Sequence, residues 1–520
     1  MSLDLLDSPF DGRSLIEASA GTGKTWTLTA LYARLLLERQ LGVGQILVVT
    51  YTTAATAELR ERIRARLAAL LAMYEGGPAP DPVLAGLHAR YPGEDAHRRL
   101  LLAVHGFDEA AIFTIHGFCQ RALQDAAFEA GGDFDSELAA DDRDVLDALL
   151  ADLWRAELAA AEPAWARFLA QKRLTPASLR QRLRGHLGKP YLRIEPRDAA
   201  PGDLAPACDA WEHARSLWLR DAASCLAELA AFDGLNKRSY DAAKFALWHS
   251  ELDAYFADPA ALFAPPAGLE KLAREALAKG CKKGFDLPDY PLCSALQALV
   301  DALEAAKPAG EARLIALQVR LLDTLNRELP QRKAAQRLLA FDDLLNRLDE
   351  ALQGEAGDAL AAALRERYPV ALIDEFQDTD PVQYAIFRRV YPGGEAGGDL
   401  CFVGDPKQAI YAFRGADLAT YLKARDEAAR QYSLATNHRS VPRLIAALNR
   451  VFDRPRPFAE PGLDYPPVGA SDKPRPQLVL PEGGAPLELV WLGDEPLGKG
   501  EAGRAEIGRA SCRERVLLSV

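Results

Sequence analysis

Residues 18–25 form a pattern that could bind the phosphates of a nucleotide. The pattern begins at Ala18, has glycines at positions 21 and 23, and ends in Lys24 and Thr25. Glycines let backbone N–H groups converge on phosphate oxygens, the lysine can reach the β- and γ-phosphates, and the threonine hydroxyl can ligate Mg²⁺. A strand pattern precedes this loop and a helix pattern follows it, which a plain glycine turn would not require. The predicted ATP-binding residues are Ala18, Ser19, Ala20, Gly21, Thr22, Gly23, Lys24 and Thr25.

Two adjacent carboxylates, Asp374 and Glu375, could complete such a site. They follow an apolar run at 370–373 that has the character of a buried strand. Asp374 could hold Mg²⁺ through its water shell, and Glu375 could orient and deprotonate an attacking water. Acidic residues at a strand end can also cap a helix. Together with the phosphate loop, however, they predict ATP hydrolysis, with Thr25 and Asp374 serving the metal.

A third group of polar and aromatic residues follows another apolar run at 400–403. Gln408 is suited to sensing the γ-phosphate. Tyr411 and Phe413 could stack on the bases of single-stranded DNA, an interaction worth roughly 1 to 3 kcal/mol per base, with Arg414 beside them. From spacing alone, burial in the core explains these aromatic residues more simply.

The elements expected around these residues form a parallel α/β sheet. Apolar runs at 14–19 and 45–51 are each followed by a helical pattern, and the runs at 370–373 and 400–403 continue the sheet. Between them, residues 126–340 carry Ala, Leu, Arg and Glu at helical spacing, which predicts an all-α insertion. Five of the seven tryptophans fall in this insertion, and we expect them to anchor helix packing rather than to stack on nucleic acid. They are Trp154, Trp165, Trp211, Trp218 and Trp248.

Composition excludes several classes of protein. The 520 residues favour three or four domains, and 49% hydrophobic with 26% charged residues is typical of a globular protein. The net charge of −12 argues against a polycation that coats nucleic acid, although local basic tracks remain possible. Seven scattered cysteines without a C-x-x-C pair argue against zinc ribbons and disulfide frameworks. Without an apolar run of bilayer length or a basic amino-terminal signal, we expect a cytoplasmic protein that has no membrane partner.

Taken in order, these and further segments resemble the motifs of UvrD-like superfamily 1A DNA helicases, and more narrowly those of the RecB family of helicase and nuclease subunits. The similarity runs from about residue 10 to about residue 500. An AddA-type subunit, which usually has Ser at the position of Gly117, and a generic UvrD-like helicase, which has a glutamine motif upstream of the loop, remain alternatives. The matching segments are EASAGTGKT at 17–25, VVTYTTAATAELRERI at 48–63, FTIHGFCQRAL at 113–123, FDDLL at 341–345, IDEFQDTDPVQY at 373–384, VGDPKQAIYAFRGAD at 403–417 and TNHRS at 436–440.

The resemblance implies roles for single residues. It implies that Asp374 and Glu375 serve Mg²⁺ and hydrolysis, and that Gln408 and Arg439 read the γ-phosphate, with Arg439 acting as an arginine finger. His116 alone would be explained more simply as a structural histidine. The residues implied to contact DNA are Tyr51, Thr52, Thr53, His116, Tyr411, Phe413 and Arg414.

The fold implied is α/β: a RecA-like P-loop NTPase motor domain with a large all-α insertion, followed by the start of a second RecA-like domain. The last fifteen residues, 506–520, form a tail that resembles the translation of a sequencing adapter, so we expect this tail to be non-native. The expected parts are 1–125 and 341–428 for the two halves of motor domain 1A, 126–340 for a 1B-like insertion, 429–505 for the beginning of motor domain 2A, and 506–520 for the tail.

The implied activity is that of an ATP-dependent 3′–5′ DNA helicase and translocase in double-strand break repair by homologous recombination. The implied partners are a DNA single strand or duplex end and RecC-like and RecD-like subunits. The later motifs of the second motor domain and the nuclease domain are not found in the sequence, so we expect the amino-terminal part of a longer helicase. A truncated ATP- and DNA-binding module without unwinding activity is the alternative. No glutamine precedes Gln40, so no adenine contact is assigned.

Overall fold

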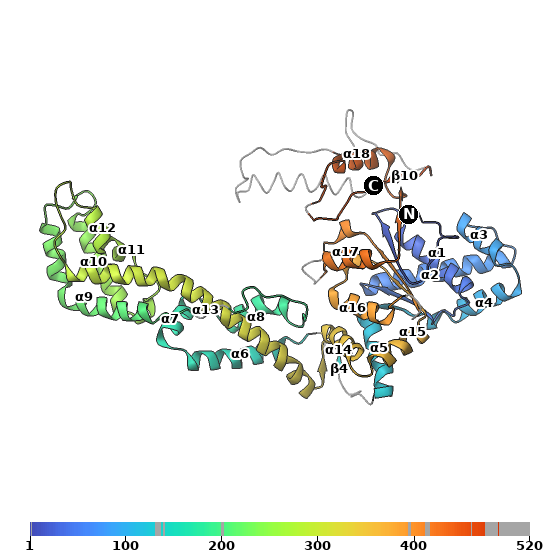
Figure 1. The fold of residues 1–520 in the computed structure, drawn as a ribbon, viewed down its shortest axis with the longest axis horizontal. Helices are drawn as coiled ribbons and strands as arrows, with labels where there is room; N and C mark the ends of the chain where they lie inside the picture. Colours follow the sequence, from blue (N-terminus) through green and yellow to red (C-terminus); the bar gives the residue numbers. More distant parts are fainter. Residues whose placement is uncertain are drawn as a thin grey trace. The chain divides into compact units, whose positions relative to one another are not determined.

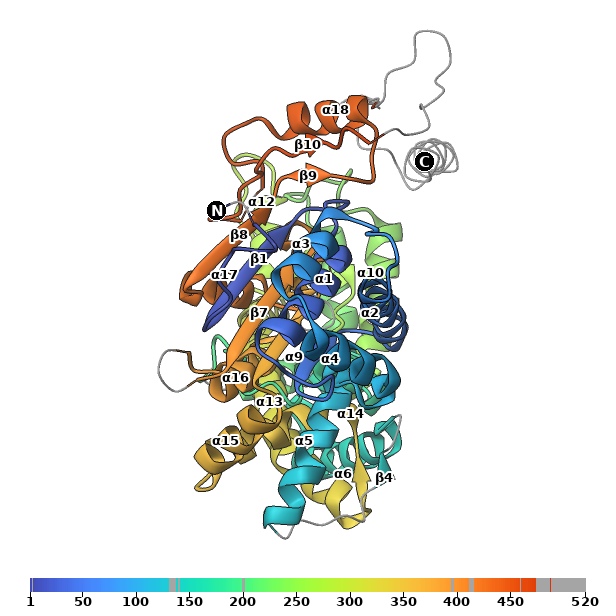
Figure 2. The same ribbon diagram turned by 90° about the vertical axis from the view of Figure 1, so that its right-hand side faces the viewer.

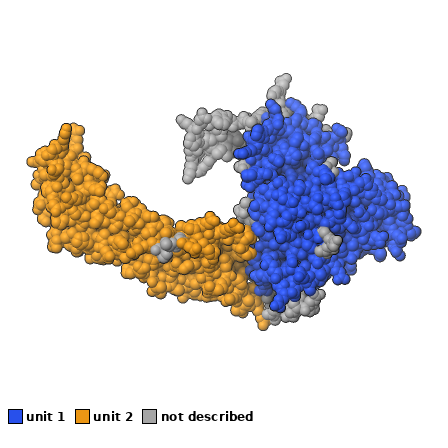
Figure 3. Space-filling model, viewed as in Figure 1, with its two compact units in different colours: residues 1–134, 341–520 blue, residues 135–340 orange. Residues whose placement is uncertain are grey.

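The computed structural model describes residues 1, 3–130, 137–138, 141–198, 202–393, 397–410, 416–458, 460–473 and 487. The chain divides into two compact units, shown in different colours in Figure 3. Unit 1 comprises residues 1–134 and 341–520, and unit 2 comprises residues 135–340. The predicted tail at 506–520 and the predicted DNA contacts Tyr411, Phe413 and Arg414 lie outside the described residues.

Unit 1 is built on a six-stranded sheet with the order β3-β2-β6-β7-β1-β8, and all of its strand pairs are parallel. Figure 2 shows β7, β1 and β8 of this sheet next to one another. Every residue of β2 and β6 is buried, as expected for strands covered on both faces. The structure thus confirms the predicted α/β fold. The strands are β1 (Arg13–Ala18), β2 (Ile46–Thr50), β3 (Ile112–Thr114), β6 (Val370–Ile373), β7 (Asp399–Gly404) and β8 (Arg430–Leu434).

Helices cover both faces of this sheet. On one face Ile16, Val48 and Leu372 share a buried core with α1 to α4. On the opposite face the ring of Phe402 packs 4.0 Å from that of Phe376 and 5.8 Å from that of Tyr384, measured between centroids. The helices of unit 1 are α1 (Lys24–Glu38), α2 (Thr53–Tyr74), α3 (Pro82–Arg90), α4 (Glu94–His105), α5 (Ile115–Ala130), α14 (Phe341–Gln353), α15 (Gly357–Arg367), α16 (Pro381–Val390), α17 (Leu418–Glu427) and α18 (Pro442–Phe452), with short 3₁₀ turns η1 (Phe107–Glu109), η4 (Phe376–Asp378) and η6 (Pro406–Gln408).

Strand β8 lies beyond residue 428, where we expected the second half of motor domain 1A to end, and it adds a strand to the same sheet. It pairs with β1, with Ser14 beside Arg430 and Ala18 beside Leu434. The family resemblance implied that residues from 429 onward belong to the next domain, and RQYSL contains no apolar run that would have indicated a strand here. An edge strand does not need one, since it has a neighbour on one side only. After β8, the short strands β9 (Thr436–Asn437) and β10 (Gly469–Ala470) form a separate parallel pair. The assignment of these parts to particular motor domains stays a prediction.

Unit 2 is almost wholly helical, as predicted for the insertion (Figure 1). The longest helix, α13, extends over 45 residues and packs along α9. The only strands among the described residues of unit 2 are β4 (Glu137–Leu138) and β5 (Leu338–Leu339), which pair in parallel close to where the chain enters and leaves. The helices are α6 (Arg143–Ala160), α7 (Pro163–Gln171), α8 (Pro176–Leu183), α9 (Ala205–Ala231), α10 (Ala242–Ala257), α11 (Ala267–Leu272), α12 (Arg274–Lys279) and α13 (Pro291–Ala335), with 3₁₀ turns η2 (Arg184–His186) and η3 (Pro259–Ala261).

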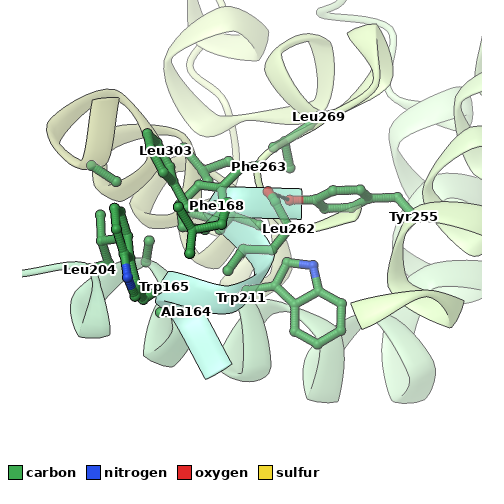
Figure 4. Close-up of a cluster of buried hydrophobic side chains, with 14 of the residues drawn as sticks. Ala164, Trp165, Phe168, Leu204, Trp211, Tyr255, Leu262, Phe263, Leu269 and Leu303 are labelled. Carbon is green, nitrogen blue, oxygen red and sulfur yellow. Dashed lines mark hydrogen bonds between the residues drawn. The ribbon is translucent and has the colours of Figure 1, made fainter. Parts of the chain in front are cut away.

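Aromatic side chains hold the helices of unit 2 together (Figure 4). Trp165 has no exposed surface, donates a 2.9 Å hydrogen bond from its indole N–H to Glu157 and stacks on Phe168, with ring centroids 5.7 Å apart. The Arg313 guanidinium lies 4.8 Å from the centre of the Trp165 ring. Trp211, Trp218 and Trp248 are also buried, and Trp154 is half-buried. The prediction that these tryptophans anchor helix packing is confirmed.

In the part of the chain that the structure describes, no helix is both long and apolar enough to span a lipid bilayer.

Candidate nucleotide site at the carboxyl edge of the sheet

The predicted phosphate-binding and catalytic residues meet at one edge of the sheet. The phosphate loop follows β1, Asp374 and Glu375 follow β6, and Gln408 lies just beyond β7. Because the strands are parallel, their carboxyl ends share one edge, which is where ligands bind in open α/β sheets. In the strand order β6-β7-β1, these three segments are immediate neighbours.

The phosphate loop has the backbone conformation that its glycines make possible. Gly21 and Gly23 have φ of 79° and 93°, in the left-handed region that side chains disfavour. Thr22 closes the loop, since its backbone N–H and its hydroxyl both donate to the Ser19 carbonyl at 3.2 and 2.8 Å. Helix α1 then begins at Lys24. A loop of this kind presents backbone N–H groups to an anion at a helix amino terminus.

Lys24 and Glu375 are in direct contact across the site. The Lys24 Nζ lies 2.8 Å from the Glu375 Oε2, and the Lys24 side chain is 12% exposed. Glu375 itself has a φ of 49°, which is uncommon for a residue with a side chain. Such strained residues cluster at active sites. The structure therefore brings together two residues that the sequence separates by 351 positions.

Asp374, the residue before Glu375, is buried. Its backbone N–H donates a 2.8 Å hydrogen bond to the Val49 carbonyl, which fixes the residue to β2. Its Oδ1 is buried and has no hydrogen-bond partner among the described residues. Burial, and next the charge of Glu375, raise the pKa of Asp374 to about 7. A buried carboxylate oxygen without a partner suits a group that receives a hydrated cation.

We expect Asp374→Asn to stabilise the protein, and to do so more at pH 8 than at pH 5. The pKa of Asp374 in the folded state, about 7, is above its unfolded value, so the wild type loses stability as pH rises from about 4 to about 7. Asparagine carries no charge to bury, and the gain should therefore grow by on the order of 2 kcal/mol between the two pH values. Calorimetric unfolding of both proteins measures this difference, and an equal gain at pH 5 and pH 8 would contradict it.

Gln408 is held by Asp405, the residue that caps the amino end of its own turn, η6. Its side-chain Nε2 donates a 2.7 Å hydrogen bond to the Asp405 Oδ2, and Asp405 is 1% exposed. The Lys407 Nζ lies 2.8 Å from the other Asp405 oxygen. Gln408 is therefore positioned near the edge by a buried carboxylate rather than being free in solution.

Two residues that organise this site were not predicted from the sequence, and Gln377 is the first of them. Gln377 is 2% exposed and bridges the ends of β6 and β7. Its Nε2 donates to the Glu375 Oε2 at 2.7 Å, and its Oε1 accepts the Asp405 N–H at 2.9 Å. The sequence signal that could have identified Gln377 is an amide among acidic residues directly after a predicted strand. Such an amide is noteworthy because, once buried, both its oxygen and its nitrogen need hydrogen-bond partners.

The second missed residue is Asn437, which attaches the 436–440 segment to the phosphate loop. Its Nδ2 donates to the Ala20 carbonyl at 3.0 Å, and its Oδ1 accepts the Arg439 N–H at 2.8 Å. The His438 N–H donates to the Gly21 carbonyl at 2.6 Å. A Cβ at Gly21 would lie 2.8 Å from the Arg439 Cβ, so only glycine fits here. Arg439 thus lies beside the phosphate loop, and its side chain is exposed.

Four residues predicted to contact DNA are among those that the structure describes, and they lie at the other end of the same edge, beyond β6. They are Tyr51, Thr52, Thr53 and His116. Strands β2 and β3 pair with Thr50 beside Thr114, which brings 51–53 and His116 to neighbouring strand ends. Thr53 begins α2 and is exposed, whereas the Thr52 hydroxyl caps α2 by accepting the Ala55 N–H at 3.1 Å. Tyr51 is half-buried.

His116 differs from the other candidates in its surroundings. Its ring packs edge-on against Phe341, with ring centroids 5.9 Å apart. Burial lowers the pKa of His116, so its imidazole is neutral near pH 7. A neutral ring can stack or form a hydrogen bond, but it adds no positive charge for a phosphate backbone.

Comparisons with known proteins agree with this geometry. A sequence model of the UvrD/REP helicase N-terminal domain matches residues 5–429. The RecBCD enzyme subunit RecB of Escherichia coli (strain K12) is 38% identical over 87% of this chain and 39% of its own length. The subunit of the same name from Haemophilus influenzae is 34% identical over 90% of this chain and 42% of its own length. The subunit from Chlamydia trachomatis is 30% identical over 86% of this chain. The chain thus spans about two fifths of the length of these relatives.

Proposed function

Because the chain belongs to the UvrD/REP helicase family, we propose that it carries the ATP-hydrolysing motor of a RecB-type DNA helicase. Membership in a helicase family implies the use of ATP. The proposed reaction is ATP-driven movement along DNA in the 3′–5′ direction, in the service of double-strand break repair by homologous recombination. A cytoplasmic location, and RecC-like and RecD-like partner subunits, are part of the same proposal, since the similar proteins are named as subunits of the RecBCD enzyme.

The observation that carries this proposal is the contact between Lys24 and Glu375 at 2.8 Å. It places the lysine of the phosphate loop and the carboxylate proposed to activate water at one site, although neither segment alone would identify an ATPase. Lys24 would exchange this partner for the β- and γ-phosphates when a nucleotide binds. Glu375 would then be released to orient and deprotonate the attacking water.

The surrounding residues suit a Mg²⁺ ion bound together with a nucleotide. Thr25 and Asp374 would hold it, and the ion would offset negative charge on the phosphates. Among the described residues no group of three or more His, Cys, Asp and Glu side chains could hold a metal by itself. This agrees with a metal that takes much of its coordination from phosphate and water. Arg439 and Gln408 would read the γ-phosphate.

DNA is proposed to cross the carboxyl edge over the ends of β2 and β3. The supporting observation is that Thr53 and its neighbours are exposed there while the phosphate loop lies on the far side of β6 and β7. Contacts through backbone phosphates and base faces do not depend on sequence, as a translocating motor requires. Tyr411, Phe413 and Arg414 remain predicted contacts of the same strand.

The test is ATP hydrolysis by the purified chain with and without an oligothymidylate, with Glu375→Gln measured alongside. We expect the oligonucleotide to stimulate hydrolysis several-fold, and Glu375→Gln to lower kcat at least 100-fold while the protein still binds nucleotide. A loss of kcat of this size with nucleotide binding retained is typical when a general base is removed. Nucleotide and DNA binding without hydrolysis by the wild type would contradict the proposal and favour the binding module considered above.

A further inference from the structure

Gln377 is a buried polar side chain to which the proposed function gives no role. It lies in the turn η4, two residues beyond Glu375, and is 2% exposed. Leaving a buried amide unsatisfied costs stability, so its two hydrogen bonds explain how it is tolerated. An apolar side chain here would leave the buried Asp405 N–H without a partner, so one of the two bonds serves the fold, whereas the other leads to the Glu375 carboxylate.

The two bonds of Gln377 join the ends of two strands. Its Nε2 donates to the Glu375 Oε2 at 2.7 Å, beyond β6, and its Oε1 accepts the Asp405 N–H at 2.9 Å, beyond β7. Gly404 packs directly against it, and a Cβ there would lie 2.9 Å from the Gln377 Oε1. The amide therefore has little room to move independently of either strand end.

The connection continues from Asp405 to Gln408. The Asp405 Oδ2 accepts the Gln408 Nε2 at 2.7 Å, and the Asp405 Oδ1 accepts the Lys407 N–H at 3.2 Å. Glu375, Gln377, Asp405 and Gln408 thus form one continuous series of short hydrogen bonds. A displacement of the turn that carries Gln408 would be transmitted to the Glu375 carboxylate through Gln377.

Gln377 also shares its Glu375 oxygen with Lys24. Both Nζ of Lys24 and Nε2 of Gln377 lie on Oε2, at 2.8 and 2.7 Å. When Lys24 turns to a phosphate, the Gln377 amide is the remaining described contact on that oxygen. It would keep the carboxylate in place at the step when Glu375 has lost its ion pair.

We propose that Gln377 is a positioning residue that fixes the Glu375 carboxylate in register with Gln408, so that γ-phosphate readout and water activation occur together. This inference rests on the proposed function. Gln377 touches neither the phosphates nor the water in this assignment. Its loss should therefore slow hydrolysis without weakening nucleotide binding.

The first experiment compares Gln377→Met with Gln383→Met in the whole chain. Methionine keeps the volume of glutamine and removes both hydrogen bonds. Gln383 is a matched control, because it is 4% exposed, lies on the nearby α16, and has no bond to Glu375. We expect Gln377→Met to lower kcat about 10- to 100-fold, with the Kd for N-methylanthraniloyl-ATP changed less than threefold. Gln383→Met should keep both values within threefold of the wild type.

The second experiment is a double-mutant cycle with Gln408→Ala. If Gln377 acts through the series that ends at Gln408, the double variant should lose no more kcat than the more damaging single variant. A merely structural role of Gln377 would instead give losses that multiply. Multiplying losses would overturn the coupling to Gln408.

The outcomes separate this inference from the proposed function. A wild type that hydrolyses no ATP overturns the proposed function, and the inference falls with it. A wild type that hydrolyses ATP while Gln377→Met keeps its kcat overturns the inference alone. If Gln377→Met does not fold, Gln377→Asn serves in its place, since the shorter amide cannot reach both partners, and an unchanged kcat in that variant overturns the inference equally.

Discussion

Replacing Lys24 with alanine should lower kcat/KM for ATP about 1,000-fold and weaken nucleotide binding at least 30-fold. The Lys24 side chain is 12% exposed at the start of α1, where a charge-assisted hydrogen bond to phosphate is stronger than in bulk water. The variant would also leave the phosphate loop without its ammonium while Glu375 keeps its negative charge. Repulsion between that charge and a triphosphate adds to the loss.

The measurement is a titration with a fluorescent ATP analogue together with steady-state hydrolysis. Lys423→Ala is the control, because Lys423 is exposed on α17, away from the carboxyl edge, and its loss should leave both values within twofold. A Kd for the Lys24→Ala variant within threefold of the wild type would show that the loop at 18–25 does not bind the phosphates.

Replacing Trp165 with alanine should destabilise unit 2 by about 3 to 5 kcal/mol. The side chain is fully buried, and its loss removes the stacking on Phe168, the hydrogen bond to Glu157 and the contact with Arg313. Nucleotide affinity should stay within threefold of the wild type, because unit 1 has a separate buried core.

Urea unfolding followed by circular dichroism measures this loss. Trp154 on the neighbouring helix α6 provides the matched control, since it is half-buried and Trp154→Ala should cost less than about 2 kcal/mol. Equal losses for the two variants would contradict the view that Trp165 is a central part of the core of unit 2.

Fully buried strands were predictable from the sequence, and short or edge strands were not. The apolar runs at 45–51 and 370–373 correspond to β2 and β6 because strands covered on both faces must be apolar throughout. Strand β3 has three residues, too few for a pattern, and β8 has a single buried residue, Tyr432, at the edge of the sheet. Both depend on a neighbouring strand that lies far away in the sequence.

The candidate site shows the same division. The phosphate loop and the acidic pair were predicted because a charge or a glycine in a fixed local pattern has few other uses. The roles of Gln377 and Asn437 depend on partners beyond other strands, 28 and 417 residues away. Local spacing contains no information about such partners, so an amide after a strand could mark Gln377 as a candidate, but only the structure shows what Gln377 and Asn437 bind.

The position of unit 2 within the chain has a consequence for how the protein is made. Both neighbours of β1 in the sheet, β7 and β8, are encoded after unit 2. At about 5 to 20 residues per second, β1 leaves the ribosome on the order of half a minute before either partner exists. During this interval unit 2, which has its own buried core, can finish folding. The nascent chain meanwhile exposes the apolar β1 segment with two unpaired edges. We therefore expect the chain to be most prone to aggregation, and to depend most on chaperones, during this period of synthesis.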